Sequence, residues 1–592
     1  MHHDLVLIAG AGLAISIAAA VFARRTGVAA PLLLVALGIA ASLLPGTPTL
    51  EVDPELILAG VLPPLLYASA VQLPVIDLRR NLSLISWLSV VMVIVTSVVV
   101  GLLVHAVFPA IPLALGIALG AVVSPTDAVA ATAVGRRLGL PPRLMTVLEG
   151  ESLVNDASAL VVLRTAIAAV GASSAFSLGE TAGDFAWAVV GAGLVGWAVA
   201  WVTVLVRQRL DDPVLNTTIS FITPFLAYVP AEELHASGVL AVVVAGLVTG
   251  AMGARRFSAR DRQTQTTTWA TINFILESGV FLALGYQLSS LVEDAREETS
   301  AGEVVGMVSL VLVTLVVLRL VGLAWPALVG RRGAGERGDR TRERLDQFEQ
   351  RLESREPKDD REETRLQWAR KRIARASADV AFEEREPITA RGYLVLAWAG
   401  MRGVVTLAAA QTIPSDTPHR DTVVLVACLV AMLSLALFGL TLPALIRRMD
   451  FPSVDPAERR DDVLTLMRQI GEDATDALGP LAEQTIDGEP LDPEVVAVLK
   501  DRFLPMLLAG VRRGAEGRPD QREQAFIIQR RYLDALRDGL LRERSVGAFS
   551  TEPLQARRGA ARPRGAAPRV VVLTEEPAQE PAPGFLEGSA TG

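Results

Sequence analysis

Apolar runs long enough to cross a lipid bilayer follow one another along most of the chain, separated by short polar segments. A transmembrane helix needs roughly 20 consecutive, mainly apolar residues. About thirteen runs of about this length occur, near residues 5–23, 29–45, 54–73, 83–107, 111–135, 144–170, 183–206, 214–230, 237–252, 268–291, 304–329, 391–412 and 421–446. The first run follows Met1–Asp4 without the basic segment of a cleavable signal, so we expect it to be retained as a helix. The pattern predicts an all-α polytopic membrane protein.

Arginine residues mark every second loop between these runs, and the loops between them are poor in basic residues. The arginine-bearing loops contain Arg24-Arg25, Arg79-Arg80, Arg136-Arg137 with Arg143, Arg207 with Arg209, and Arg255-Arg256 with Arg260 and Arg262. Positively charged loops stay on the cytoplasmic side of a membrane. The alternation therefore predicts an N-terminus outside, a C-terminus in the cytoplasm, and residence in the plasma (inner) membrane.

Segments without membrane-crossing runs divide the rest of the chain. We expect a membrane transport domain in two parts, residues 1–330 and 391–448, separated by a charged cytoplasmic loop, 331–390, which is rich in helix-forming residues and suited to a helical hairpin. Residues 449–545 become amphipathic at helical spacing, which predicts a small cytoplasmic helical domain. Residues 546–592 are rich in Ala, Pro, Arg and Gly, and predict a disordered tail.

Composition excludes several classes of function. Cys428 is the single cysteine, which rules out a disulfide framework and a Cys-rich metal site. The net charge of -8 is modest, and basic residues gather in the short loops, so a nucleic-acid partner is not expected. The C-terminal regions contain no phosphate-binding loop or nucleotide fingerprint. We expect that the protein uses no cofactor and is not an enzyme.

A polar cluster, Glu151-Ser152-Leu153-Val154-Asn155-Asp156, interrupts the apolar run 144–169. A carboxylate near the middle of a transmembrane helix costs several kcal/mol in hydrocarbon, so it must face protein or a water-filled cavity. Ser152 and Asp156 share one helix face, as do Glu151 and Asn155, because residues four apart are neighbours on a helix. Several hard oxygen atoms on a buried surface indicate a site for a hard cation. A patch of polar contacts between helices is the alternative interpretation.

A second motif, Ser124-Pro125-Thr126-Asp127, interrupts the apolar segment 111–134. Proline lacks an N–H and disfavours the α conformation of the preceding residue, so the helix should break there. A break at this depth is tolerated where it lines a cavity, and transporters use such discontinuous helices to hold ions. We expect Asp127 to offset the positive end of the second half-helix.

Further charged residues fall inside the predicted spans: Arg164, Glu277, Arg319 and Arg402. Buried charges are usually paired, and Glu277 shares a helix face with Asn273. Arg402 stands in Gly400-Met401-Arg402-Gly403, whose glycines permit a second helix break. The two breaks are predicted seven spans apart and in opposite orientation. This indicates an inverted repeat, in which two broken helices cross at the membrane midplane.

Three ordered motifs resemble those of monovalent cation:proton antiporters of the sodium/proton exchanger type: Ser124–Asp127, Glu149–Asp156 and Gly400–Val405. The resemblance covers about residues 5–448 and implies a homodimer of thirteen-span protomers that alternates by an elevator-like motion. It further implies that Asp156 binds the cation and the proton in turn, with ligands from Asp127, Ser152 and the backbone carbonyl of Thr126. By the same resemblance Asn155 before Asp156 indicates electroneutral exchange, and Glu151 with Arg402 forms a structural ion pair. One departure is that Ala68-Ser69 stands where some prokaryotic members have a glutamate, which puts ion affinity in question.

Competition between ions at one carboxylate is sufficient for exchange, because burial favours the protonated form and a nearby cation favours the ionised form. We expect Na⁺ for H⁺, with Li⁺ or K⁺ as alternative ions and K⁺/H⁺ antiport as the alternative function. A cation channel would need a ring of ligands, and an intramembrane aspartyl protease would use Asp127 and Asp156 as its pair. A membrane sensor would depend on residues 455–592.

Overall fold

The computed structural model describes residues 2–26, 29–44, 55–171, 178–353, 359–449, 451, 465, 485–486, 489–490 and 496. The first twelve helices are α1 (His2–Thr26), α2 (Ala30–Ser42), the π-helix η1 (Leu56–Val61), α3 (Leu62–Gln72), α4 (Val75–Arg80), α5 (Leu82–Ser86), the π-helix η2 (Trp87–Val91), α6 (Met92–Val107), α7 (Leu113–Val123), α8 (Ala128–Leu138), α9 (Pro142–Gly171) and α10 (Leu178–Arg207). The others are α11 (Pro213–Glu233), α12 (Gly238–Arg256), α13 (Ala259–Tyr286), α14 (Leu288–Ala295), α15 (Ala301–Glu353), α16 (Asp360–Arg385), α17 (Ala390–Trp398), α18 (Val404–Gln411) and α19 (Arg420–Met449).

The predicted all-α polytopic membrane fold is confirmed. Each predicted apolar run coincides with one or more of these helices. Among the described residues, nine helical segments are long and apolar enough to cross a membrane, and shorter apolar helices cover Gly10–Ala23, Ala30–Ser42 and Leu56–Gln72. Large apolar side chains such as Leu102, Val190 and Val313 are exposed on these helices, as contact with lipid requires.

Polar residues at the helix starts determine several boundaries. Helix α13 begins nine residues before the predicted run at 268, because Ser258 and Asp261 form a reciprocal capping box that satisfies its first N–H groups. Asp212 accepts a hydrogen bond from the Val214 N–H at 2.7 Å, and Pro213 occupies the first turn of α11. Apolar periodicity alone does not reveal a polar first turn, so the prediction began α13 too late.

The helices pack in two groups. The first bundle contains α6, α7, α8, α9, α15, α17, α18 and α19. The second bundle contains α1, α2, α3, α10, α11, α12 and α13. Helices α3 and α13 of the second bundle face α9 and α18 of the first, so a boundary between the two groups runs past both polar motifs identified in the sequence.

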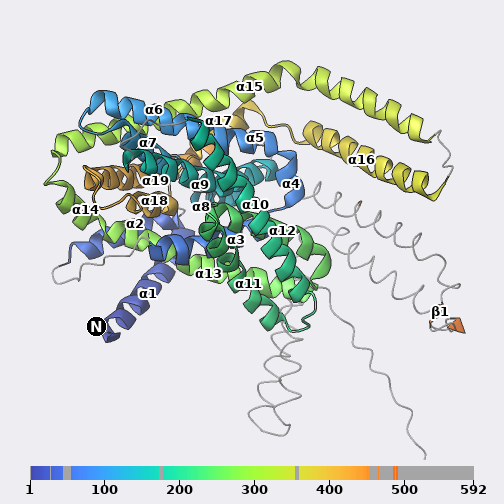
Figure 1. Cartoon of the computed structure of the whole chain (residues 1–592), viewed down its shortest axis with the longest axis horizontal. Coiled ribbons are helices and arrows are strands. Elements are labelled where there is room, and N and C mark those ends of the chain that lie inside the picture. Colours follow the sequence, from blue (N-terminus) through green and yellow to red (C-terminus); the bar gives the residue numbers. More distant parts are fainter. Residues whose placement is uncertain are drawn as a thin grey trace, which may run out of the picture. The chain divides into compact units, whose positions relative to one another are not determined.

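The charged segment 331–390 forms the second half of α15 and all of α16, which lie side by side as a hairpin (Figure 1). The carboxyl-terminal part of α16 is held by Asp379, which accepts hydrogen bonds from Arg79 at 2.7 Å and Arg80 at 2.8 Å. The Arg80 guanidinium also stacks over the Phe382 ring, 4.6 Å from its centroid. The hairpin is therefore attached to the arginine-bearing α4 segment.

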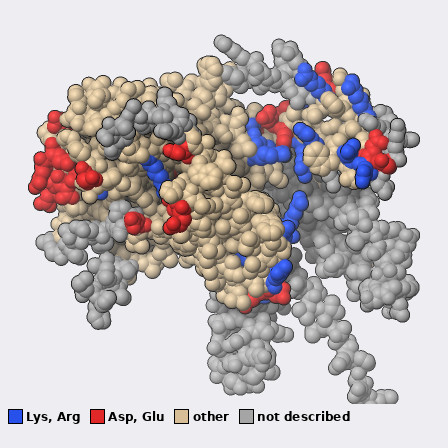
Figure 2. Space-filling model, viewed as in Figure 1, with Lys and Arg blue, Asp and Glu red and all other residues tan. Residues whose placement is uncertain are grey.

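Charged side chains on the visible face gather at separate ends (Figure 2). Acidic residues cluster where α14 lies, in the segment that carries Glu293, Asp294, Glu297, Glu298 and Glu303. Basic residues lie mainly around α4 and α16, and the surface between is largely uncharged. This distribution matches the arginine-rich and arginine-poor loops of the sequence.

Little of the region after Met449 belongs to the described residues. There, Thr485–Ile486 and Glu489–Pro490 form two short antiparallel strands, β1 and β2. The predicted helical domain 449–545 otherwise lies outside the described residues, as does the predicted disordered tail 546–592. Both remain predictions.

Candidate functional site

Two broken helices cross next to the polar motif of α9. Residues 124–127 separate α7 from α8, and residues 399–403 separate α17 from α18. The breaks touch directly, since the Asp127 N–H donates a hydrogen bond to the Met401 carbonyl at 2.7 Å. Gly403 lies so close to the Asp127 side chain that a Cβ atom would overlap it. The predicted crossing of discontinuous helices is thus present, and it depends on a glycine at position 403.

Charged side chains balance three of the four half-helix ends at the crossing. The Asp127 carboxylate accepts a hydrogen bond from the Val129 N–H at 2.8 Å and so caps the positive end of α8. Arg402 donates to the carbonyls of Val123, at 2.7 Å, and Gly400, at 2.6 Å, where helix α7 and the segment after α17 end. Negative charge therefore lies at the amino end of α8 and positive charge at the carboxyl ends of α7 and α17, as the helix dipoles favour.

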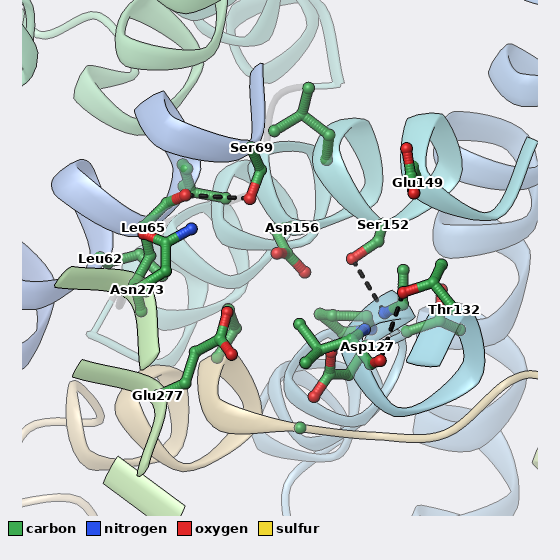
Figure 3. Close-up of a pocket in the computed structure, with 18 of the residues that line it drawn as sticks. Leu62, Leu65, Ser69, Asp127, Thr132, Glu149, Ser152, Asp156, Asn273 and Glu277 are labelled. Atoms are coloured by element: carbon green, nitrogen blue, oxygen red, sulfur yellow. Dashed lines mark hydrogen bonds between the residues drawn. The ribbon is translucent and has the colours of Figure 1, made fainter. Parts of the chain in front are cut away.

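A cavity of about 210 Å³ opens beside the crossing, between the two bundles. The first bundle contributes Thr126, Asp127, Ser152, Asp156 and Gly403, and the second contributes Ser69, Asn273 and Glu277. Figure 3 shows Asp156 and Glu277 directed into the same space from opposite walls. Glu149 also lines the cavity, as do Gln72 and Arg136, which lie at helix ends next to arginine-bearing loops.

Asp156 is the most deeply placed carboxylate of this cavity, with 6% of its surface exposed. Within the described residues, no donor hydrogen-bonds to its carboxylate and no cation pairs with it. Beside it, the Ser152 hydroxyl accepts a weak hydrogen bond from the Ala128 N–H at 3.3 Å. A buried carboxylate without a protein partner needs a proton or a cation to balance its charge.

The two faces of α9 line different cavities, as the four-residue spacing predicted. Ser152 and Asp156 face the 210 Å³ cavity, whereas Glu151 and Asn155 line a small cavity on another side, together with Arg319 and Arg402. The Asn155 amide donates to the Thr126 hydroxyl at 2.7 Å. The structure therefore places Asn155 outside the cavity of Asp156, where it holds the helix break in position. Its predicted part in binding the cation or proton remains a prediction.

Glu151 pairs with Arg319, not with Arg402 as predicted. The Arg319 guanidinium makes a bidentate contact with the Glu151 carboxylate, at 2.6 and 2.9 Å. Glu151 also accepts a hydrogen bond from the Thr126 hydroxyl at 2.9 Å. Arg402 does not pair with Glu151 because it already donates to the carbonyls at the two helix breaks, whereas Gly400 leaves room for Arg319 to approach.

Two further intramembrane charges have contrasting surroundings. Arg164 pairs with Glu232 at 2.8 Å, away from the cavity. Glu277 lines the cavity itself, together with Asn273 one turn earlier. Sequence reasoning noted the shared face of Asn273 and Glu277 but assigned Glu277 no role, because nothing in one helix indicates which neighbour it faces.

The cavity does not form a rigid metal cage. Among the described residues, no group of three or more His, Cys, Asp or Glu side chains lies close enough to hold one metal ion. Asp127, Asp156 and Glu277 therefore line one space without converging on a single point. Such a site suits an ion that binds and leaves, with hydroxyl and carbonyl oxygens as the remaining ligands.

Known proteins are similar to this chain in sequence, and a solved structure is similar to it in fold. A protein of Escherichia coli named as the uncharacterized Na⁺/H⁺ exchanger YjcE is 28% identical over 533 residues, covering 85% of this chain and 88% of its own. A sodium, potassium, lithium and rubidium/H⁺ antiporter of Bacillus pumilus is 31% identical over 436 residues, covering 71% and 58% respectively. The solved structure of the sodium proton antiporter MjNhaP1 from Methanocaldococcus jannaschii has a TM-score of 0.55 at 17% identity, and covers 76% of this chain and 99% of its own.

The match to a known family spans nearly all of the membrane part of the chain. Residues 12–448 correspond to the family described as sodium/hydrogen exchanger, transmembrane. This range includes both helix breaks, the α9 motif and the cavity between the bundles. The chain therefore belongs to the transmembrane sodium/hydrogen exchanger family.

Proposed function

We propose that this protein is a secondary active antiporter that exchanges Na⁺ for H⁺ across the plasma membrane. The observation that carries the proposal is the buried Asp156 carboxylate, which has no partner among the described residues and stands beside two crossing helix breaks. The names of the relatives, a Na⁺/H⁺ exchanger and an antiporter for several alkali cations, support cation/proton antiport.

Exchange follows from competition at Asp156. Burial favours the protonated carboxyl group, whereas a cation near it favours the ionised form. When the proton is bound, the cation lacks the negative charge of Asp156; when the cation is bound, the Asp156 proton is expelled. Asp127, Ser152 and the backbone carbonyl of Thr126 would supply further oxygen ligands from the same cavity wall.

The position of the cavity between the two bundles supports an elevator-like motion. Asp127, Ser152 and Asp156 all belong to the first bundle, so the complete ligand set can move as one body against α3 and α13 of the second. The cavity is lined by Arg136, at the carboxyl end of α8, next to an arginine-bearing loop. With the N-terminus outside and the C-terminus inside, this cavity faces the cytoplasm. The predicted homodimer and the role of the tail remain predictions.

Proteoliposomes that contain the full chain and an internal pH dye test the proposal. Addition of Na⁺ salts should dissipate an imposed pH gradient, and parallel additions of Li⁺ and K⁺ salts define selectivity. Dissipation by K⁺ alone would favour K⁺/H⁺ antiport. Cation flux without proton movement would indicate a channel, and no flux of either kind would contradict the proposal.

The stoichiometry should be one cation for one proton. Asp127 is fixed at the amino end of α8 by the Val129 N–H, so we expect it to stay ionised while Asp156 alone changes its occupant. The exchange rate should then be insensitive to a potassium–valinomycin potential, where K⁺ is not itself a substrate. Each net charge moved would be worth roughly 2.3 kcal/mol per 100 mV, so a clear rate change would show that the cycle moves net charge and that Asp127 also carries a proton.

Gly403→Ala should reduce exchange strongly, because the added methyl group would overlap the Asp127 side chain and separate the crossing helices. A displacement of about 1 Å at a reacting site can cost roughly 100-fold in rate, and we expect a loss of this order. Gly279→Ala on α13 is the matched control, since a Cβ there meets no atom within 4 Å. Equal exchange by both variants, measured with the same dye, would show that close packing at Gly403 is unimportant.

A further inference from the structure

Glu277 belongs to the wall opposite Asp156 and is half-buried. It projects from α13 in the second bundle, whereas Asp127 and Asp156 project from the first. No donor or cation among the described residues contacts the Glu277 carboxylate. Glu277 is thus a second carboxylate, besides Asp156, that lines the 210 Å³ cavity without a structural partner among the described residues (Figure 3).

Glu277 also lines a larger cavity of about 860 Å³. This second cavity lies between α1, α2, α8, α13 and α19 and carries Arg137 and Arg447 at helix ends. Val129, Glu277 and Phe281 line both cavities. Glu277 is the one titratable side chain, among the described residues, that reaches both spaces.

The charges around the two cavities differ in sign. The first cavity carries Asp127 and Asp156, with Arg136 and Glu149 joined as an ion pair at 2.5 Å. Apart from Glu277, the charged residues of the second cavity are Arg137 and Arg447. An entering cation is therefore favoured in the first cavity and opposed in the second, which leaves a proton as the ion that Glu277 is suited to carry.

We propose that Glu277 is a proton relay between Asp156 and the second cavity. This inference rests on the proposed antiport function. When a cation binds the Asp156 carboxylate, the Asp156 proton passes through water to the Glu277 carboxylate, and protonated Glu277 then releases it to water in the second cavity. One cation enters the site and one proton leaves, so atoms and charge balance. Because Glu277 and Asp156 belong to different bundles, relative motion of the bundles would break the relay in the other transport state.

The pH profile of exchange distinguishes this role from a structural one. Glu277→Gln removes the relay and a negative charge that faces Asp156. The other charged groups around Glu277 stay unchanged: Asp127, Arg136 and Glu149 in the first cavity, and Arg137 and Arg447 in the second. Loss of the negative charge weakens proton retention at Asp156, so the acidic limb of the profile should shift to lower pH by on the order of one unit. Loss of the relay should lower the maximal rate about tenfold, and Glu277→Asp should restore both.

Glu293→Gln on α14 is the matched control, because it makes the same change outside both cavities. If Glu277→Gln does not survive solubilisation, we expect the same shift in pH profile and the same loss of rate from Glu277→Asn, whose amide side chain is smaller. A wild-type protein that moves neither cation nor proton would overturn the proposed function. A wild-type protein that exchanges normally, with Glu277→Gln matching Glu293→Gln in rate and pH profile, would overturn the relay alone.

Discussion

Asp156→Asn should abolish cation/proton exchange while leaving a folded membrane protein. Asparagine has nearly the same shape, but it can neither carry the proton nor offer a negative ligand to the cation. No donor among the described residues contacts the Asp156 carboxylate, so the substitution leaves no protein group newly unpaired. Removal of a buried, unpaired carboxylate should if anything raise thermal stability.

Exchange should be measured with the internal pH dye, and folding by size-exclusion profile and thermal unfolding in detergent. Asp294→Asn on α14, outside the cavity, is the matched control and should retain exchange. Asp156→Glu keeps the charge but moves it by one methylene group, and we expect weak exchange with altered cation affinity. Dissipation of a pH gradient by the asparagine variant would contradict the central assignment.

Local sequence patterns predicted the parts of this site that depend on one helix. Pro125 and the glycines around Arg402 indicated the two breaks, and the spacing of Ser152 and Asp156 indicated their shared face. These predictions succeeded because proline, glycine and helical periodicity act on the backbone of their own segment.

Pairings between distant helices were harder to predict. Glu151 could have met any of several intramembrane arginines, and apolar periodicity does not distinguish Arg319 in α15 from Arg402 between α17 and α18. Arg402 is held instead by the carbonyls of Val123 and Gly400, groups that a sequence does not show as unsatisfied. The position of Glu277 in the cavity was not predicted for the same reason, since it depends on α13 facing α9 and α18.

The Glu151–Arg319 pair predicts a large effect on stability. The Glu151 carboxylate is 1% exposed and is held by Nη1 and Nη2 of Arg319 and by the Thr126 hydroxyl. Arg319→Gln should therefore destabilise the protein by about 3–5 kcal/mol, because it leaves a buried charge without a counter-charge. Arg319 also donates to the Leu396 carbonyl at 3.0 Å. Part of the lost stability therefore comes from the loss of this hydrogen bond near the end of α17.

A double-mutant cycle separates these contributions and tests which arginine is the partner. Glu151→Gln combined with Arg319→Gln should recover part of the loss, with a coupling energy of about 1–3 kcal/mol. Glu151→Gln combined with Arg402→Gln is the matched comparison, and its coupling should be smaller, since Arg402 donates to backbone carbonyls. The measurement is thermal unfolding in detergent of the wild type, of the single variants Glu151→Gln, Arg319→Gln and Arg402→Gln, and of the two double variants. Stronger coupling to Arg402 than to Arg319 would restore the pairing expected from the sequence and reject the bidentate contact as the stabilising one.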